Sequence, residues 1–129
     1  RRAGAPYAVL SKTRRGDRDV SIEVPGLERY RTHTPVLVDD IVSTARTMAV
    51  AVAGLRDAGC PAPVCVGVHA VFAGDAYETL RRAGPAAIVT GDTIEHPSNA
   101  IPLIGGLAEA VRDLLAGPPP VTEGAGGAA

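Results

Sequence analysis

The chain has 129 residues, which is enough for one hydrophobic core and too short to expect two. Apolar residues make up 46% of the chain but aromatic residues only 3%, so the core must consist mainly of Val, Ala, Leu and Ile. The formal net charge of −1 argues against nucleic acid or a polybasic membrane surface as a partner. No apolar run approaches the roughly 18 residues of a transmembrane helix.

Positive charge is concentrated near the start of the chain. Residues 1–31 hold eight of the thirteen basic residues and four of the fourteen acidic ones. This basic third could meet a phosphorylated ligand or could be a solvated arm, and charge alone leaves both interpretations open.

Cysteine usage indicates a cytoplasmic protein. Cys60 and Cys65 lack metal-ligand spacing, so we expect both to be reduced and structural. No signal peptide is visible. The chain begins with Arg rather than Met, and we expect it to be the C-terminal part of something longer.

The first elements are short. Residues 5–10 form an apolar run that predicts a strand, and residues 11–19 are polar and charged, which indicates a mobile loop. Residues 20–24 alternate apolar and polar side chains, as an edge or hairpin strand does. Pro25 and Gly26 then predict a turn.

Strands and helices alternate from there on. Residues 35–39 predict a buried strand, and a helix is expected from Thr44 to about Ala58, with Met48, Val52 and Leu55 on one face. Residues 64–68 and 87–90 predict two more strands. Between them a helix begins at Asp75, which can cap it, and ends at Gly84.

The chain ends with a helix and a tail. A loop is expected over residues 91–100, and Leu107, Val111 and Leu114 mark a last helix that ends at Gly117. Residues 118–129 have low complexity and are expected to be disordered.

This alternation predicts an α/β fold whose parallel strands are buried on both faces by helices. Ligands of such sheets bind at the carboxyl ends of the strands. Asp39 and Asp40 lie at one such end, and the loop that starts near Gly91 lies at another.

A turn that can bind phosphate follows the two aspartates. Residues 36–47 read V-L-V-D-D-I-V-S-T-A-R-T. Backbone N–H groups at the start of the following helix, three hydroxyl groups and one cation suit a phosphate monoester. The candidate residues are Ser43, Thr44, Ala45, Arg46 and Thr47. On the turn alone, a Ser or Thr that caps its own helix is the better interpretation.

The acidic pair favours a ligand site over a simple helix cap. Carboxylates accept hydrogen bonds from hydroxyl groups, so Asp39 and Asp40 could hold the diol of a sugar whose phosphate lies on the turn. Paired acids can also bridge Mg²⁺.

The stretch resembles the phosphoribosyl pyrophosphate (PRPP) motif of type I phosphoribosyltransferases and of ribose-phosphate diphosphokinases. In these families the acids hold the ribose hydroxyls and the turn holds the 5′-phosphate. The resemblance implies a type I phosphoribosyltransferase-like fold over residues 1–117, with a catalytic loop and hairpin at 11–34.

The sequences on either side of residues 36–47 indicate which of these families the chain resembles. Y-A-V-L-S-K-T-R-R-G resembles the catalytic arm of the ribose-phosphate diphosphokinases, most of all the archaeal-type branch, and assigns catalytic roles to Lys12 and Arg14. Lys12 is also the only lysine among the thirteen basic residues. V-H-A-V-F-A-G-D, V-T-G-D-T-I and G-G-L-A-E-A-V-R-D-L-L resemble later blocks of the same family.

The resemblance implies an enzyme that transfers diphosphate from ATP to ribose 5-phosphate, giving PRPP and AMP, with Mg²⁺ and as a homo-oligomer. It also implies that the ATP and metal sites lie in a missing N-terminal half, so this chain alone would be inactive. A PRPP-consuming phosphoribosyltransferase and a non-catalytic regulatory homologue remain as alternatives.

The turn departs from the family pattern. D-T-A-G-T or D-T-G-G-T is commoner there, so Ser43 replaces an acid and Arg46 a glycine. Because Arg rarely adopts a positive φ, the turn is expected to use a conformation open to ordinary residues. His69 is expected to be packed or hydrogen-bonded rather than catalytic, and His33 and His96 receive no role. Asp92 and Thr93 are candidates for substrate contact.

Overall fold

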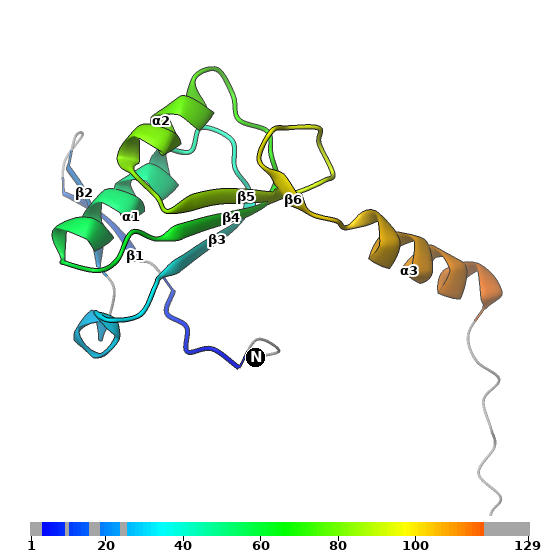
Figure 1. Ribbon diagram of the computed structural model, residues 1–129, viewed down its shortest axis with the longest axis horizontal. Helices are drawn as coiled ribbons and strands as arrows, with labels where there is room; N and C mark the ends of the chain where they lie inside the picture. Colours follow the sequence, from blue (N-terminus) through cyan, green and yellow to red (C-terminus); the bar gives the residue numbers. More distant parts are fainter. Residues whose placement is uncertain (1–3, 10, 16–18, 24–25, 118–129) are drawn as a thin grey trace, which may run out of the picture.

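The computed structural model describes residues 4–9, 11–15, 19–23 and 26–117. A two-stranded hairpin precedes a four-stranded sheet with its helices (Figure 1). The elements are β1 (Ser11–Arg15), β2 (Asp19–Glu23), the 3-10 helix η1 (Leu27–Tyr30), β3 (Val36–Ile41), α1 (Arg46–Asp57), β4 (Val64–His69), α2 (Ala76–Ala83), β5 (Ala87–Gly91), β6 (Asn99–Ile101) and α3 (Ile104–Ala116).

The main sheet is parallel throughout, in the order β3-β4-β5-β6. Leu37, Cys65 and Ile88 are aligned across the first three strands. The α/β class and the parallel sheet predicted from the sequence are therefore confirmed. The predicted strands near 64–68 and 87–90 are also confirmed.

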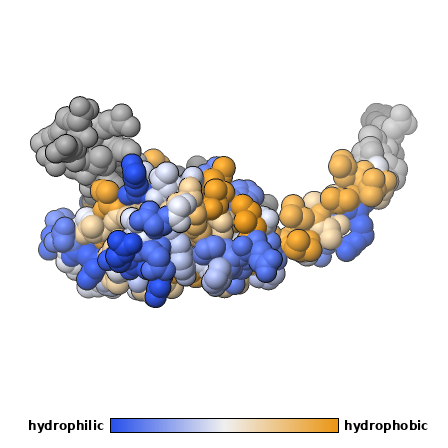
Figure 2. Space-filling view, turned by 90° about the horizontal axis from the view of Figure 1, so that it is seen from above, coloured by the Kyte–Doolittle hydropathy of each residue, from blue (hydrophilic) through white to orange (hydrophobic). Residues whose placement is uncertain are grey.

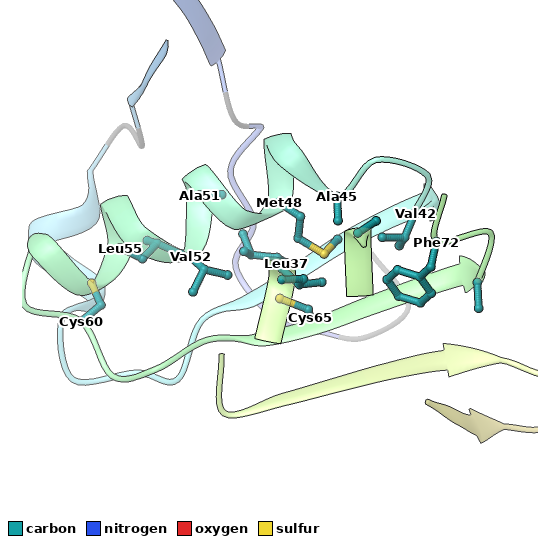
Figure 3. Packing of buried hydrophobic residues seen from close by; sticks show 13 residues of the cluster. Leu37, Val42, Ala45, Met48, Ala51, Val52, Leu55, Cys60, Cys65 and Phe72 are labelled. Atoms are coloured by element: carbon teal, nitrogen blue, oxygen red, sulfur yellow. The ribbon is translucent and has the colours of Figure 1, made fainter. Parts of the chain in front are cut away.

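Helix α1 covers one face of this sheet (Figure 3). Its Met48, Val52 and Leu55 lie on one face, as their spacing predicts, and Val52 is completely buried. They pack in the same cluster as Leu37 of β3 and Cys65 of β4. Burial raises the pKa of the Cys65 thiol to about 11, so this cysteine stays protonated and unreactive near neutral pH.

No helix covers the second face of the sheet in the part of the chain that the structure describes (Figure 1). It is formed by residues that alternate with the core-facing ones, and we call these residues the valine face. They are Val36, Val38, Val64, Val66, Val68 and Val89. Val38 is 72% exposed and Val36 is 58% exposed. The prediction that β3 is buried is therefore wrong, because helices α1 and α2 cover only the opposite face (Figure 1).

The N-terminal predictions are partly wrong. Residues 4–9 form no strand, and the predicted loop contains β1, which pairs antiparallel with β2. Hairpin strands gain their pairing from backbone hydrogen bonds, which side-chain polarity does not reveal. Residues 16–18, Pro25 and the predicted tail lie outside the described residues.

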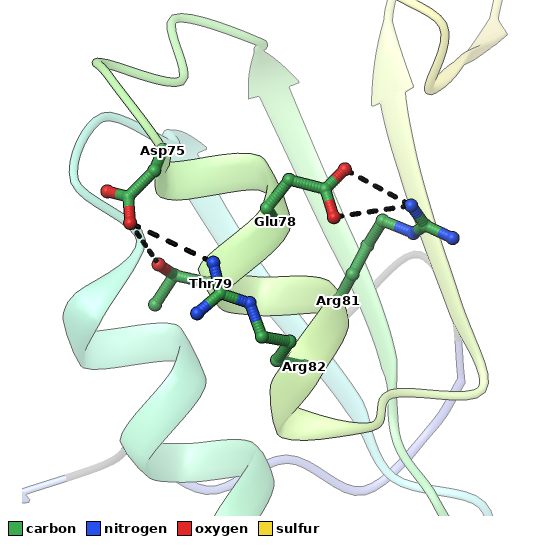
Figure 4. Close-up of polar contacts among 5 residues, drawn as sticks. All are labelled: Asp75, Glu78, Thr79, Arg81 and Arg82. Carbon is green, nitrogen blue, oxygen red and sulfur yellow. Dashed lines mark hydrogen bonds and ion pairs between the residues drawn. The ribbon is translucent and has the colours of Figure 1, made fainter.

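Asp75 precedes α2 but does not cap it (Figure 4). Its carboxylate accepts a hydrogen bond from Thr79 Oγ1 at 3.3 Å and lies 3.9 Å from Arg82, and no side-chain cap bond forms. Glu78 pairs with Arg81 instead of closing a capping box. The predicted helix is present, but the expected cap is wrong, because the Asp75 carboxylate has Thr79 and Arg82 as partners and the Glu78 carboxylate has Arg81.

Two further elements differ from expectation. The predicted loop after β5 contains the short strand β6, and α3 extends away from the body of the protein (Figure 1). Helix α3 ends at Gly117, whose φ of 81° suits glycine, as predicted. Within the described ranges, no helix has the length and apolarity that a membrane span requires.

Gly67 lies at a crowded point of β4, and its replacement by Ala should destabilise the fold. An added Cβ would lie 2.5 Å from Val42 Cγ2 and 3.4 Å from Thr90 Cγ2, both in buried side chains. We expect a loss of about 1–3 kcal/mol in the free energy of unfolding, measured with urea.

Gly54→Ala is the matched control. Gly54 lies within α1, and an added Cβ there would meet nothing within 4 Å. This change should stabilise the protein by up to about 1 kcal/mol, because Ala favours helix over Gly. Equal effects of the two changes would contradict the crowding assigned to Gly67.

Candidate active site at the carboxyl edge of the sheet

The candidate site begins where β3 passes into α1. Asp39 and Asp40 lie near the end of β3. The side chain of Val42, at the start of the turn that follows, is buried in the core and holds the turn in place. The Val42 N–H donates to the His69 carbonyl at 3.1 Å, and the Val42 carbonyl accepts from the Phe72 N–H at 2.9 Å. The turn is therefore held by the neighbouring β4–α2 connection.

The turn contains a left-handed residue. Ala45 directly precedes α1 and has a φ of 55°, while Arg46 is the first helical residue. The expectation that the turn uses only ordinary conformations is therefore wrong, although Arg46 itself avoids the positive φ. Phe72, in the adjacent connection, has a φ of 33°. Non-glycine residues with positive φ are strained, and such strain is concentrated at functional sites.

The first backbone N–H groups of α1 have no side-chain cap. Ala45 supplies no cap bond, and the Ala49 N–H donates to the Ala45 carbonyl at 2.8 Å, so the N–H groups of residues 46–48 precede the intrahelical ladder. Ser43 and Thr44 are exposed and do not satisfy these groups. The self-capping interpretation is therefore wrong, and the helix start can receive an anion.

The two carboxylates influence each other. Asp40 Oδ1 accepts the Ile41 N–H at 2.8 Å. Partial burial, then a hydrogen bond with the Asp40 side chain and its negative charge, raise the pKa of Asp39 above its ordinary value. Hydroxyl donors or a cation would relieve this repulsion.

A groove opens beside the same strand. It has a volume of about 600 Å³ and follows the free edge of β3, with Asp39 and Thr47 in its wall. Tyr7 and Tyr30 contribute aromatic surface further along the groove. Asp39 and Thr47 thus border a space that a small molecule could enter.

The loop after β5 supplies the other side of the carboxyl edge. Thr93 Oγ1 donates to the Val68 carbonyl at 3.2 Å, so the His69 Nδ1 atom, 2.7 Å away, acts as the donor to Thr93. His69 is therefore hydrogen-bonded, as expected. Asp92 Oδ1 accepts the Leu103 N–H at 2.8 Å, which gives this carboxylate a structural partner.

His96, for which no role was predicted from the sequence, organises this loop. Its ring lies 4.6 Å from Phe72 and 4.7 Å from Tyr77, between centroids. Its Nδ1 atom is 2.7 Å from Ser98 Oγ, and Ser98 Oγ is 2.8 Å from Thr90 Oγ1. No sequence pattern marks this histidine, because its partners come from three separate segments.

Lys12 and Arg14 lie on the hairpin rather than at the turn. Their backbone partners in β2 are Ile22 and Val20, and β2 contacts α1. The structure thus brings Asp39, Asp40 and residues 43–47 together. Lys12 and Arg14 lie on a separate element, the β1–β2 hairpin. This hairpin contacts α1, the helix that follows the turn.

Asp39 and Asp40 are two neighbouring carboxylates near the end of β3. Among the residues that the structure describes, no group of three or more His, Cys, Asp or Glu side chains could hold a metal ion. A pair of carboxylates suits Mg²⁺, which takes one or two protein carboxylates and completes its shell with water and substrate phosphates.

Comparisons with known proteins agree with this geometry. Residues 1–102 match the family described as the phosphoribosyl transferase domain. The chain is 37% identical over 100 residues to a ribose-phosphate pyrophosphokinase of Bifidobacterium longum. The aligned region covers 75% of this chain and 29% of that protein. It is 32% identical over 111 residues to a ribose-phosphate pyrophosphokinase of Methanopyrus kandleri. This aligned region covers 86% of this chain and 38% of that protein. The chain thus spans about a third of the length of these relatives.

Replacement of Asp40 by Asn should lower the pKa of Asp39. The change removes the neighbouring negative charge, whereas the effect of burial remains, so the value should fall but stay above that of an exposed aspartate. Carboxyl ¹³C NMR titration of both proteins measures this. A pKa of Asp39 that is the same in the variant would show that the two carboxylates do not interact.

Proposed function

Because the chain belongs to the phosphoribosyl transferase domain family, we propose that it forms the ribose 5-phosphate site of a ribose-phosphate diphosphokinase. The observation that carries this proposal is the uncapped start of α1, which follows Asp39 and Asp40 after a short turn. One end of this site suits a phosphate and the other end suits hydroxyl groups, as a sugar phosphate requires.

The phosphate end is formed by backbone and side-chain donors. The N–H groups that open α1 donate to the 5′-phosphate and the positive end of the helix dipole favours its charge. Arg46 and Thr47 are exposed at this end and add a cation and a hydroxyl group. Ser43 and Thr44, also exposed, add two more hydroxyl groups.

The ribose end is formed by the carboxylates. Asp39 and Asp40 accept hydrogen bonds from the ribose hydroxyls and so orient the anomeric hydroxyl. Mg²⁺ arrives with ATP, and the same carboxylates could supply one or two of its ligands. When bound, Mg²⁺ neutralises charge on the phosphates.

The reaction is a diphosphoryl transfer. The anomeric oxygen of ribose 5-phosphate forms a bond to the β-phosphorus of ATP and loses its proton, and the bond from that phosphorus to the α–β bridging oxygen breaks. The products are PRPP and AMP. Lys12 and Arg14 stabilise the charge of the transferring group, and the hairpin that carries them packs through β2 against α1.

Two other functions remain as alternatives, and an AMP-release assay distinguishes them from the diphosphokinase. A phosphoribosyltransferase that consumes PRPP would use the same acids and turn but would release no AMP from ATP and ribose 5-phosphate. A regulatory homologue would bind the sugar phosphate without turnover. The names of the relatives favour the diphosphokinase.

Ribose 5-phosphate should bind to this chain, and the acids should matter for the sugar rather than for the phosphate. Isothermal titration of the double variant Asp39→Asn, Asp40→Asn should show at least a tenfold weaker Kd for ribose 5-phosphate, equal to about 1.4 kcal/mol. Inorganic phosphate should bind as in the unchanged chain.

Asp57→Asn is the control for this titration. Asp57 is an exposed carboxylate at the opposite end of α1 from the turn, so its removal changes net charge without touching the site. Equal weakening by the control and by the double variant would refute the ribose role of the acidic pair.

Lys12→Ala should reduce turnover in a longer protein that contains this chain and its nucleotide-binding part. AMP release from ATP and ribose 5-phosphate should fall by well over threefold, whereas Arg15→Ala on the same strand should keep most of the rate. A loss within about threefold for Lys12→Ala, roughly 0.65 kcal/mol of barrier, would reject its catalytic role.

A further inference from the structure

Three aromatic rings from separate segments pack together, and we call them the aromatic triad. Phe72 lies in the β4–α2 connection, Tyr77 in α2 and His96 in the loop after β5. The ring centroid of His96 lies 4.6 Å from that of Phe72 and 4.7 Å from that of Tyr77, and the Phe72 and Tyr77 centroids are 5.1 Å apart. Phe72 is buried and the other two are half-buried, whereas the apolar side chains of α3 are exposed along the projecting helix (Figure 2). The aromatic triad therefore belongs to the packed body of the protein.

The backbone at Phe72 holds the first residues of the turn after β3. The Phe72 N–H donates to the Val42 carbonyl at 2.9 Å, and the Ala73 N–H donates to the Ser43 carbonyl at 3.1 Å. The side chains of Val42 and Phe72 also belong to one buried cluster (Figure 3). The position of Ser43, where the proposed phosphate turn begins, thus depends on the positions of Phe72 and Ala73.

Phe72 is held in a conformation that phenylalanine does not prefer. Its φ is 33°, and a non-glycine residue keeps such a strained backbone only where the surrounding structure enforces it. A relaxed, negative φ would displace Ala73 relative to Phe72, so the two hydrogen bonds to the turn would not both remain. The rings of Tyr77 and His96 pack against the Phe72 ring and oppose this relaxation.

Hydrogen bonds fix the orientation of the His96 ring. The Ser98 N–H donates to His96 Nδ1 at 3.2 Å, so this nitrogen is an acceptor and the ring proton lies on Nε2. Ser98 Oγ lies 2.7 Å from the same Nδ1 and therefore donates to it, and Thr90 Oγ1 donates in turn to Ser98 Oγ at 2.8 Å. Thr90 Oγ1 also accepts from Asn99 Nδ2 at 3.0 Å. Because Thr90 and Ser98 are buried, this chain of hydrogen bonds holds His96 against Phe72 from within the protein.

We propose that His96 is a positioning residue for the phosphate-binding turn at residues 43–47. Its ring, held by Ser98, keeps Phe72 in the strained conformation in which residues 72 and 73 bind the start of the turn. In this role His96 acts through Phe72 and not by contact with the ligand. The predicted effect on ligand affinity rests on the proposed function, whereas the predicted effect on the hydrogen bonds of the turn does not.

Amide hydrogen exchange, measured by NMR on the 129-residue chain, tests the link between His96 and the turn. His96→Ala should speed exchange of the Phe72 and Ala73 N–H groups by about tenfold, because both hydrogen bonds open more often. The Val52 N–H, within α1, should exchange as in the unchanged chain. Glu95→Ala, which removes an exposed side chain of the same loop, is the matched control and should change none of these rates. Unchanged rates at Phe72 and Ala73, or an equal rise at Val52, would overturn the proposal.

Two further variants separate the ring from its hydrogen bond and do not depend on the folding of His96→Ala. His96→Phe keeps a ring against Phe72 but loses the acceptor for Ser98, and His96→Asn keeps an acceptor but loses the ring. Exchange at Phe72 and Ala73 should be slower in His96→Phe than in His96→Asn by about fivefold. Equal rates in the two variants, or the reverse order, would contradict positioning through the ring.

Ligand affinity supplies the second measurement. In isothermal titration, His96→Asn should raise the Kd of both ribose 5-phosphate and inorganic phosphate by about fivefold, and His96→Phe by less than about twofold. A loss for both ligands distinguishes a disturbed turn from the acidic pair, whose removal should affect the sugar phosphate alone. Failure of the unchanged chain to bind either ligand would refute the proposed function, while the exchange rates would still decide whether His96 holds the turn. Unaltered affinity of His96→Asn for ligands that the unchanged chain binds would overturn the positioning role.

Discussion

The packing of α1 against the parallel sheet is the contact on which the rest of the structure depends. Val52 and Leu55 are buried against β3 and β4 without any aromatic residue from the helix or from these strands. This contact fixes the axis of α1, and hence the point at which its first N–H groups emerge. Because β3 feeds directly into that point, the same contact sets the distance between the acidic pair and the helix start.

The site itself combines two features that would each be unfavourable alone. Asp39 and Asp40 repel each other at a strand end, and the helix start carries donors with no side-chain cap. A ligand with hydroxyl groups at one end and an anion at the other satisfies both. The left-handed backbone conformation of Ala45 is strained, and it lies between the acidic pair and the first N–H groups of α1.

The loop after β5, at the carboxyl edge of the sheet, is held in place by residues with no chemical role in the proposed reaction. His96 packs against both Phe72 and Tyr77 and is hydrogen-bonded to Ser98, which anchors the loop after β5. This loop in turn carries Thr93 to His69 and Asp92 to the start of α3. The arrangement links the site edge to the helix that projects from the protein.

The sequence by itself determined the α/β class, the parallel sheet, α1 with its apolar side, and the grouping of the acidic pair with the turn, because these depend on periodicity and on neighbours in the chain. It failed where the outcome depends on distant partners. Only the tertiary structure decided that Asp75 pairs with Thr79 and Arg82 instead of capping α2, and that, in the described part of the chain, no helix covers the valine face (Figure 1). It also decided that the positive φ falls on Ala45 rather than on Arg46. Exposed side chains choose among competing partners in space, and a strand's own residues do not specify which of its faces receives a helix.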